Sequence, residues 1–346
     1  MSKSENLAAV LEEPKSRLKT LVRPTPTPKE GEILVRNYAI AANPVDWKIQ
    51  ELGIFITKFP TVLGSDAAGV VTAVGPGVTK FKVGDRVTGF AGVIYSQNPD
   101  DGAWQTYTIL REIATLPLPD SISFEEGSTF PMAFATAAVA IFENLGLPRP
   151  TEPVKPQESG FLIWGGSSSI ATAGIQLAKN LGFKVFTTAS PKNHEYLKSL
   201  GATEVIDHRD PEAVSKLVAL AKAAGTPLQY GFDAIVEGNS AISSANALLA
   251  SGGKGGKLVL SFTWPEGHAK PDGIELSQTG AFRTGLDLTE LGSWLFNDYL
   301  PSAIKNKTIV PAPKIQIVEG GIGAAQKAFD QLKAGVSATK VVVKLD

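Results

Sequence analysis

The sequence predicts an α/β protein with two domains, one mainly β and one built on a doubly wound parallel sheet. The 346 residues exceed the roughly 100 to 200 that a single domain usually has. Short β-like runs divided by Gly, Pro and Asp turns fill residues 32–118, whereas strand and helix patterns alternate after residue 160. A proline-rich stretch, 148–156, separates the two patterns and suits no regular element.

The mainly β part is predicted from the runs ILVRNYAI, AAGVVTAVG, GDRVTGF and QTYTIL. Glycines and a proline between them, as in residues 76–84, suit tight turns between paired strands. We therefore expect a compact antiparallel or barrel-like domain. A ligand-binding role for these glycines is the alternative interpretation.

The second domain shows a βαβ pattern. Its expected strands are 160–164, 184–189, 204–207, 232–236 and 257–262, with helices at 170–181, 194–200, 211–223 and 241–250. This alternation predicts a parallel sheet with helices on both faces. From about residue 284 we expect helices near 291–305 and 322–334, and a closing strand at 340–345.

Composition excludes several classes of function. Lys and Arg total 33 against 34 for Asp and Glu, so nothing favours a nucleic-acid partner. The absence of cysteine rules out disulfides, a thiolate nucleophile, iron–sulfur clusters and thiolate zinc ligands. The three histidines lie far apart, so we expect no metal. The longest apolar stretch, 130–142, is too short for a bilayer span, and we expect a cytoplasmic protein without a membrane partner.

The sharpest local motif follows the strand 160–164 directly and precedes a helix. It consists of Gly165, Gly166, Ser167, Ser168, Ser169 and Ile170. A strand, a glycine turn and a helix N-terminus together present free N–H groups and a positive dipole end to a phosphate. Two glycines of the usual G-x-G-x-x-G pattern are absent, but small residues still permit close approach and the hydroxyls can donate. The alternative is a tight turn without a ligand.

The end of the next strand predicts the cofactor. A carboxylate about 20 residues after the turn would bind a ribose 2′-hydroxyl and repel a 2′-phosphate. Here Ser190, Lys192 and Asn193 offer a hydroxyl, a cation and an amide, without an acid. Such donors favour phosphate, so we predict NADPH rather than NADH. Alternatively, Ser190 caps the following helix and Lys192 points into solvent.

Four motifs occur in an order that resembles the medium-chain dehydrogenase/reductase superfamily. They are NPVDWK at 43–48, LGSDAAG at 63–69, VGDRV at 83–87 and the glycine–serine turn. With the SPKN segment at 190–193, the chain most resembles the zinc-independent quinone oxidoreductases and the fungal enoyl reductases that work with polyketide synthases. The resemblance implies a GroES-like catalytic domain, residues 1–127 and 284–346, interrupted by a Rossmann domain, residues 128–283. It also implies a nicotinamide held in the cleft between them.

The departures from zinc alcohol dehydrogenases indicate the mechanism. Those enzymes place a cysteine ligand where this chain has Asn43, and a His-Glu pair where it has Ser65 and Asp66. Without zinc as a Lewis acid, direct alcohol oxidation lacks its usual source of alkoxide. Hydride addition to an activated C=C bond asks less, namely positioning, stabilisation of an enolate and delivery of a proton.

The resemblance also implies roles for individual residues. Asp46 and Trp47 would lie beside the cofactor. Lys48 would serve as catalytic proton donor or relay, or else contact a ribose or a phosphate or form a structural ion pair. Thr136 would bond the carboxamide and border the substrate, and Phe134 would wall the substrate pocket unless it is only buried. Further cofactor contacts would be His208, Thr339 and Lys340, the last alternatively a strand-edge cation. Phe282 lies in a stretch expected to line the substrate pocket.

These observations predict an NADPH-dependent, zinc-independent oxidoreductase that reduces an enone or enoyl thioester. The first alternative is a quinone or aldehyde reductase with the same cofactor. The alternative from another class is a dinucleotide-binding protein without turnover. We expect a small-molecule substrate, free or as an acyl chain on a carrier or synthase, and a monomer or homodimer.

Overall fold

The computed structural model describes residues 5–150 and 152–346 and divides them into two compact units. The first unit contains residues 5–135, 282–306 and 311–346. The second contains residues 136–281, apart from 151, and 307–310. The domain boundaries expected from the sequence, after residues 127 and 283, remain a proposal for the functional domains.

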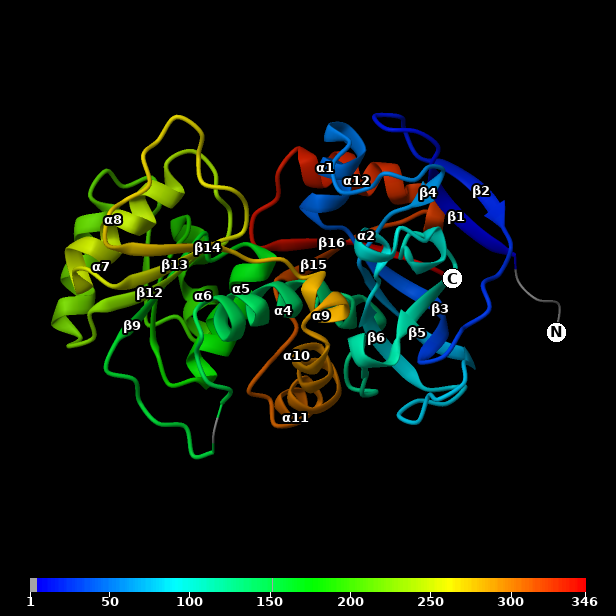
Figure 1. Cartoon of the computed structure of the whole chain (residues 1–346), viewed down its shortest axis with the longest axis horizontal. Coiled ribbons are helices and arrows are strands. Elements are labelled where there is room, and N and C mark those ends of the chain that lie inside the picture. The colour runs from blue at the N-terminus through cyan, green and yellow to red at the C-terminus, as the bar shows by residue number, and fades with distance from the viewer. Residues whose placement is uncertain (1–4, 151) are drawn as a thin grey trace. The chain divides into compact units, whose positions relative to one another are not determined.

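The main sheet of the first unit joins segments from both ends of the chain. Its order is β15-β16-β3-β5-β6-β8, and β7 pairs with β3. The strands are β3 (Glu32–Ala41), β5 (Asp66–Val74), β6 (Arg86–Phe90), β7 (Tyr107–Arg111), β8 (Thr115–Pro117), β15 (Lys314–Val318) and β16 (Thr339–Lys344). All pairs are antiparallel except β15 with β16. The red C-terminal strand β16 therefore lies beside the blue β3 (Figure 1).

A second, three-stranded sheet and several helices complete this unit. The sheet has the order β2 (Lys19–Arg23), β1 (Asn6–Leu11) and β4 (Thr61–Val62). The helices are α1 (Pro44–Leu52), α2 (Val93–Ser96), α3 (Phe124–Gly127), α4 (Pro131–Ala138), which continues into the second unit, α9 (Arg283–Leu286), α10 (Thr289–Ser293), α11 (Leu300–Lys305) and α12 (Ala325–Lys333). Short 3₁₀ turns lie at Pro99–Asp101, Glu112–Ala114 and Gly321–Ala324, and a π-helical segment lies at Trp294–Tyr299.

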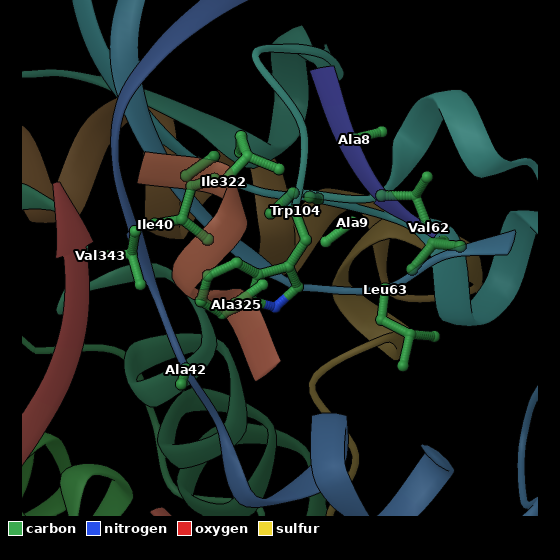
Figure 2. Close-up of a cluster of buried hydrophobic side chains, with 14 of the residues drawn as sticks. Ala8, Ala9, Ile40, Ala42, Val62, Leu63, Trp104, Ile322, Ala325 and Val343 are labelled. Atoms are coloured by element: carbon green, nitrogen blue, oxygen red, sulfur yellow. The ribbon is translucent and has the colours of Figure 1, made fainter. Parts of the chain in front are cut away.

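The core of the first unit surrounds the fully buried indole of Trp104. Side chains from β1, β3, α12 and β16 meet around it, among them Ala9, Ile40, Ala325 and Val343 (Figure 2). The ring of Phe329 lies edge-on to the indole, with 5.4 Å between centroids. A buried indole N–H needs an acceptor, and this one points toward the polar cluster described below.

The second unit is built on a six-stranded parallel sheet of order β11-β10-β9-β12-β13-β14. The strands are β9 (Gly160–Trp164), β10 (Lys184–Thr188), β11 (Glu204–Ile206), β12 (Leu228–Asp233), β13 (Gly256–Leu260) and β14 (Ile274–Gln278). In chain order this is 3-2-1-4-5-6, the order of a dinucleotide-binding Rossmann sheet. The strand order reverses at β9, so ligands are expected at the carboxyl ends of β9 and its neighbours.

Helices cover both faces of this sheet. They are α5 (Ser169–Asn180), α6 (His194–Leu200), α7 (Ala213–Ala223) and α8 (Ser240–Gly252), with a 3₁₀ turn at Pro191–Asn193 and a π-helical segment at Val139–Asn144. Leu162 and Trp164 of β9 belong to the core formed with α7 and α8, while Ile163 points to the opposite face against Gly174 of α5. Helices α7 and α8 pack against each other (Figure 1), with α8 over β12 and β13 and α7 against β10 and β11.

Several expected element boundaries need correction. The fourth strand of the parallel sheet is 228–233 rather than 232–236, because the chain turns at Asp233. A sixth strand, β14, lies within the stretch that was expected only to line a pocket. The expected helix 291–305 is interrupted by the π-helical segment, and the one near 322–334 begins as a 3₁₀ turn. Strands β1, β2 and β15, which lie within residues 6–23 and 314–318, were not predicted from the sequence.

In the described part of the chain, we find no helix that combines the length and apolar character needed to cross a bilayer.

Candidate functional site

Three side chains form a buried ionic cluster in the first unit. The Lys340 ammonium of β16 lies 2.9 Å from Asp66 Oδ2 and donates to Asn43 Oδ1 at 2.6 Å. Asn43 Nδ2 donates to the same Asp66 oxygen at 2.8 Å. The Lys340 and Asp66 side chains are only 3% and 0% exposed. A buried ammonium without a counter-charge would be very costly, so β16, β5 and the residue before α1 are bound to one another here.

The other oxygen of Asp66 holds the start of a helix. Asp66 Oδ1 accepts a hydrogen bond from the Met132 N–H at 2.6 Å. Met132 lies in the first turn of α4, where N–H groups have no partner within the helix and a carboxylate is favoured by the dipole. Asp66 therefore connects the cluster to the helix that carries Phe134.

Asp46, in the first turn of α1, is buried beside this cluster. Its Oδ2 accepts from the Asn43 N–H at 3.0 Å and from the Trp104 indole at 3.4 Å. Burial raises the pKa of Asp46 to about 7, although these two hydrogen bonds oppose the shift. Its Oδ1 and the buried Ser65 hydroxyl have no hydrogen-bond partner among the described residues. The cluster thus retains polar atoms with unused bonding capacity.

The remaining predicted residues of the first unit have contacts of their own. Trp47 and Lys48 of α1 are half-buried, and the Lys48 ammonium lies 5.7 Å from the Trp47 ring centroid. Phe134 is buried and contacts Phe130, with 5.7 Å between centroids. The half-buried Phe282 lies directly before α9. The Thr339 hydroxyl donates to the Ser337 carbonyl at 2.9 Å.

The glycine–serine turn of the second unit is held by the neighbouring strand. Gly165 N–H donates to Thr188 Oγ1 at 3.0 Å, and Gly166 N–H donates to the Thr188 carbonyl at 2.8 Å. Gly165 has φ +80°, and a Cβ there would lie 2.6 Å from Ile235. A Cβ on Gly166 would lie 2.2 Å from the Thr187 hydroxyl oxygen. Both glycines are therefore required by close approach of the neighbouring elements.

The serines that follow the turn fit an anion at the N-terminus of α5. Ser168 is the N-cap of α5, and its hydroxyl accepts from the Ala171 N–H at 3.3 Å. The Ser169 hydroxyl is buried and has no hydrogen-bond partner among the described residues. An orphaned hydroxyl beside unpaired helix N–H groups and the positive dipole end is a donor set that suits a pyrophosphate. Ile170 occupies the first turn of the same helix.

The segment 190–193 follows β10 at the same edge of the sheet. Ser190 precedes the 3₁₀ turn, but its side chain makes no capping hydrogen bond. Among the described residues, the exposed Lys192 side chain makes no hydrogen bond or ion pair, whereas Asn193 is buried. Ser190 therefore does not cap the turn through its side chain. The Ser190 hydroxyl and the Lys192 ammonium remain available to a ligand.

Two further predicted residues belong to the second unit. His208 follows β11, and its exposed ring lies 3.7 Å from Asp207, which binds Arg209 through both oxygens. This bidentate contact lowers the pKa of Asp207 to about 2. Thr136 is buried in α4, and its carbonyl accepts from the Thr279 hydroxyl at 2.8 Å.

The structure brings together residues whose contacts the sequence did not reveal. Asn43 and Asp66 drew attention only as replaced zinc positions, and Lys340 lies 274 residues beyond Asp66 in the chain. Thr188 lies inside the expected strand 184–189, and its hydroxyl, beside that of Thr187 and just before Ser190, is the signal that could have indicated its contact with the turn. The predicted residues fall into two sets, one in each unit, and their individual roles stay predictions.

Comparison with known proteins agrees with both halves of this description. Residues 29–120 match the alcohol dehydrogenase GroES-like domain, and residues 169–306 match a family described as zinc-binding dehydrogenase. The trans-enoyl reductase tndF of Aspergillus flavipes is 36% identical over 99% of both chains. The dehydrogenase pigH of Monascus ruber is 38% identical, covering 95% of this chain and 96% of that one.

Solved structures show the same fold. An alcohol dehydrogenase superfamily protein from Novosphingobium aromaticivorans superposes with a TM-score of 0.81 at 24% identity, over 99% of this chain and 100% of that one. A mycobacterial quinone oxidoreductase superposes with a TM-score of 0.74 at 25% identity, over 98% and 99%.

A GroES-like unit, a Rossmann sheet and the glycine–serine turn define an oxidoreductase that uses a nicotinamide cofactor. The chain belongs to the medium-chain dehydrogenase/reductase superfamily, in the branch of the quinone oxidoreductases and fungal trans-enoyl reductases.

The residues at the zinc positions do not fit the zinc that the family name implies. Asn43 and Ser65 supply an amide and a hydroxyl, and Asp66 is already bound to the Lys340 ammonium. Catalytic zinc sites use three His, Cys or carboxylate ligands, and a fixed cation at this place would repel a second one. No group of three His, Cys, Asp or Glu side chains suited to a metal occurs in residues 5–150 and 152–346.

Proposed function

We propose that this chain is an NADPH-dependent, zinc-independent reductase of an activated C=C bond in an enone or enoyl thioester. The observation that supports the proposal is the Lys340–Asp66–Asn43 cluster, in which an ammonium binds Asn43 and Asp66, two residues at positions that the resemblance assigns to zinc ligands. The relatives named trans-enoyl reductases, 36% identical in the case of tndF, support the same reaction.

The second unit would hold the cofactor through its turn and the segment after β10. The free N–H groups of α5 and the Ser169 hydroxyl would receive the pyrophosphate. Ser190, Lys192 and Asn193 would receive the 2′-phosphate, since no carboxylate follows β10 in this segment. His208 would lie beside the adenine, because it follows the strand next to β10.

In the first unit, Asp46, Trp47, Lys48, Thr339 and Lys340 are proposed to lie near the cofactor. NADPH supplies a hydride to the β-carbon of the conjugated bond. The chain's own part is to position the substrate, exclude water and deliver a proton, for which we propose Lys48. Lys48 is half-buried in the helix that Asn43 and Asp46 anchor. Phe134, Thr136 and Phe282 are the proposed substrate contacts.

The test is the oxidation of NADPH by the purified chain in the presence of one substrate at a time. We expect turnover with an enone or an enoyl thioester, and weaker turnover with saturated aldehydes. Lys48→Met should lower kcat while the NADPH dissociation constant stays unchanged, with Lys58→Met, an exposed lysine in the same unit, as the control. Turnover confined to quinones would favour the alternative function, a quinone reductase, which the similarity to the 25% identical mycobacterial quinone oxidoreductase supports.

NADPH binding without consumption of any of these compounds would contradict the proposed reaction. The form of the acyl substrate has its own test, because kcat/KM can be compared for a short thioester and the same acyl group on a carrier protein. A large preference for the carrier-bound form would identify a synthase-bound acyl chain as the substrate. The molar mass of the purified chain, measured by light scattering, would decide between the proposed monomer and homodimer.

A further inference from the structure

We propose that Lys340 is a positioning residue whose ammonium is the resident cation of the first unit and fixes the starts of helices α1 and α4. This proposal gives Lys340 a role through Asn43 and Asp66, in place of the direct cofactor contact that the resemblance implies. Only its kcat and KM measurements rest on the proposed function.

The contacts of Lys340 account for two of the three donors of its ammonium. One donates to Asn43 Oδ1 at 2.6 Å and one to Asp66 Oδ2 at 2.9 Å. The lysine side chain is 3% exposed, so it is enclosed by the unit rather than extended into solvent. Its position is set by the pairing of β16 with β3, in which Val342 lies opposite Ala41.

Each partner of the ammonium continues to a helix. Asn43 is the residue before α1, and its own N–H is bound by Asp46 at 3.0 Å. Asp66 binds the Met132 N–H of α4 at 2.6 Å. Helix α1 carries Trp47 and Lys48, and α4 carries Phe134. The cation therefore fixes the starts of two helices through Asn43 and Asp66.

Loss of one partner should harm the cluster more than loss of both. Lys340→Met leaves the Asp66 carboxylate buried without its cation, and Asp66→Asn leaves the ammonium without its counter-charge. Truncating one member of a buried pair is strongly destabilising, whereas a neutral pair of similar volume is often tolerated. In the double variant, an asparagine at 66 can still accept from the Met132 N–H and donate to Asn43.

The experiment compares the wild type, Lys340→Met, Asp66→Asn, the double variant and Lys344→Met. Lys344 is the matched control, because it lies on the same strand, is 52% exposed and pairs with Glu125 at 3.5 Å. We measure the urea midpoint, the NADPH dissociation constant, and kcat and KM separately. Each single variant in the buried pair should lower the urea midpoint and reduce kcat by about tenfold or more. The double variant should recover to within about threefold of the wild type, and Lys344→Met should remain unchanged.

A direct cofactor contact predicts a different pattern. In that case Asp66→Asn would bind NADPH nearly normally, and the double variant would bind it as weakly as Lys340→Met. Either result would overturn the proposal, as would a double variant less stable than both single ones. If the wild type consumes NADPH with none of the tested substrates, the proposed function fails. The urea midpoints of the same variants still decide whether Lys340 and Asp66 act as one unit.

Discussion

At the scale of single residues, two neighbouring acids, Asp46 of α1 and Asp66 of β5, differ in how well their charges are compensated. Asp66 has Lys340, Asn43 and the Met132 N–H as partners for its carboxylate. Asp46 receives only two neutral donors, one of them at 3.4 Å, and one of its oxygens has no hydrogen-bond partner among the described residues. Its carboxylate is consequently the poorly compensated charge of this region.

The stability of the first unit should therefore depend on the ionisation of Asp46. Because the pKa of Asp46 rises to about 7 in the folded chain, the native state binds this proton more tightly than the unfolded state. The protonated Asp46 carboxyl therefore contributes to the stability of the fold at acidic pH, and this contribution is lost as the pH rises from about 4 to about 7. Asp46→Asn removes this loss, and we expect it to raise the free energy of unfolding near pH 8 by roughly 1–3 kcal/mol relative to the wild type.

Urea unfolding near pH 5 and near pH 8 measures this effect. Asp85→Asn is the control of opposite sign, because the Lys82 N–H and ammonium lower the pKa of the half-buried Asp85. That variant should be slightly less stable near pH 8. An Asp46→Asn variant that is no more stable than the wild type near pH 8 would contradict the poor compensation of the Asp46 carboxylate.

A second prediction at this scale concerns the choice of cofactor. Lys192→Ala should weaken NADPH binding about tenfold, because it removes one charge-assisted contact of roughly 1.5 kcal/mol to the 2′-phosphate. NADH lacks that phosphate, so its affinity should stay the same. Fluorescence titration with both cofactors provides the comparison, and Lys198→Ala, an exposed lysine of the following helix, is the control. Equal losses for NADPH and NADH would remove the proposed role of Lys192.

At the scale of elements, the turn between β9 and α5 is confined from both sides. Thr188 of β10 binds two of its N–H groups, and Ile235, after β12, fills the space beside Gly165. The strands β10 and β12 flank β9 where the strand order reverses. The same neighbours that form the crevice for a dinucleotide therefore also set the shape of the turn.

Gly165→Ala should accordingly destabilise the second unit more than a glycine substitution that only changes the backbone preference. Gly225 is the control, because it has φ +67° and open space around its Cα, whereas Gly165 has φ +80° and Ile235 against it. We expect about 1 kcal/mol for Gly225→Ala and roughly 1–3 kcal/mol more for Gly165→Ala. Only Gly165→Ala should also weaken the binding of NADPH. Equal urea midpoints for the two variants would contradict the role given to Ile235.

The elements also show which parts of the fold were predictable. The strand at 160–164 and the helix at 194–200 coincide with β9 and α6, because a buried apolar run and a 3.6-residue period are strong local signals. β14 escaped prediction because its sequence, IELSQ, mixes burial and exposure at the edge of the sheet. The contact between Lys340 and Asp66 depends on the antiparallel pairing of β16 with β3, which no local pattern encodes.

At the scale of the whole molecule, the predictions for the two units are independent. The sequence indicates the zinc positions through Asn43, Ser65 and Asp66. The Lys340 ammonium that binds Asn43 and Asp66 could be identified only from the fold. The turn at 165–169 was recognisable locally, whereas its confinement by Thr188 and Ile235 required the sheet order. Each unit therefore supplies one property of the proposed enzyme, independence of a metal from the first and cofactor affinity from the second.

These two properties predict how the intact chain responds to ligands. Dialysis against EDTA should leave the midpoint of thermal unfolding and the NADPH-dependent activity unchanged, because Lys340 already supplies the cation at Asp66. NADPH at about 100 times its dissociation constant should stabilise the fold by roughly 2.7 kcal/mol, as linkage requires for a ligand that binds only the native state. NADH at the same concentration should stabilise it less. Activity lost in EDTA and restored by zinc would contradict the assignment of the Lys340 cluster, whatever the substrate proves to be.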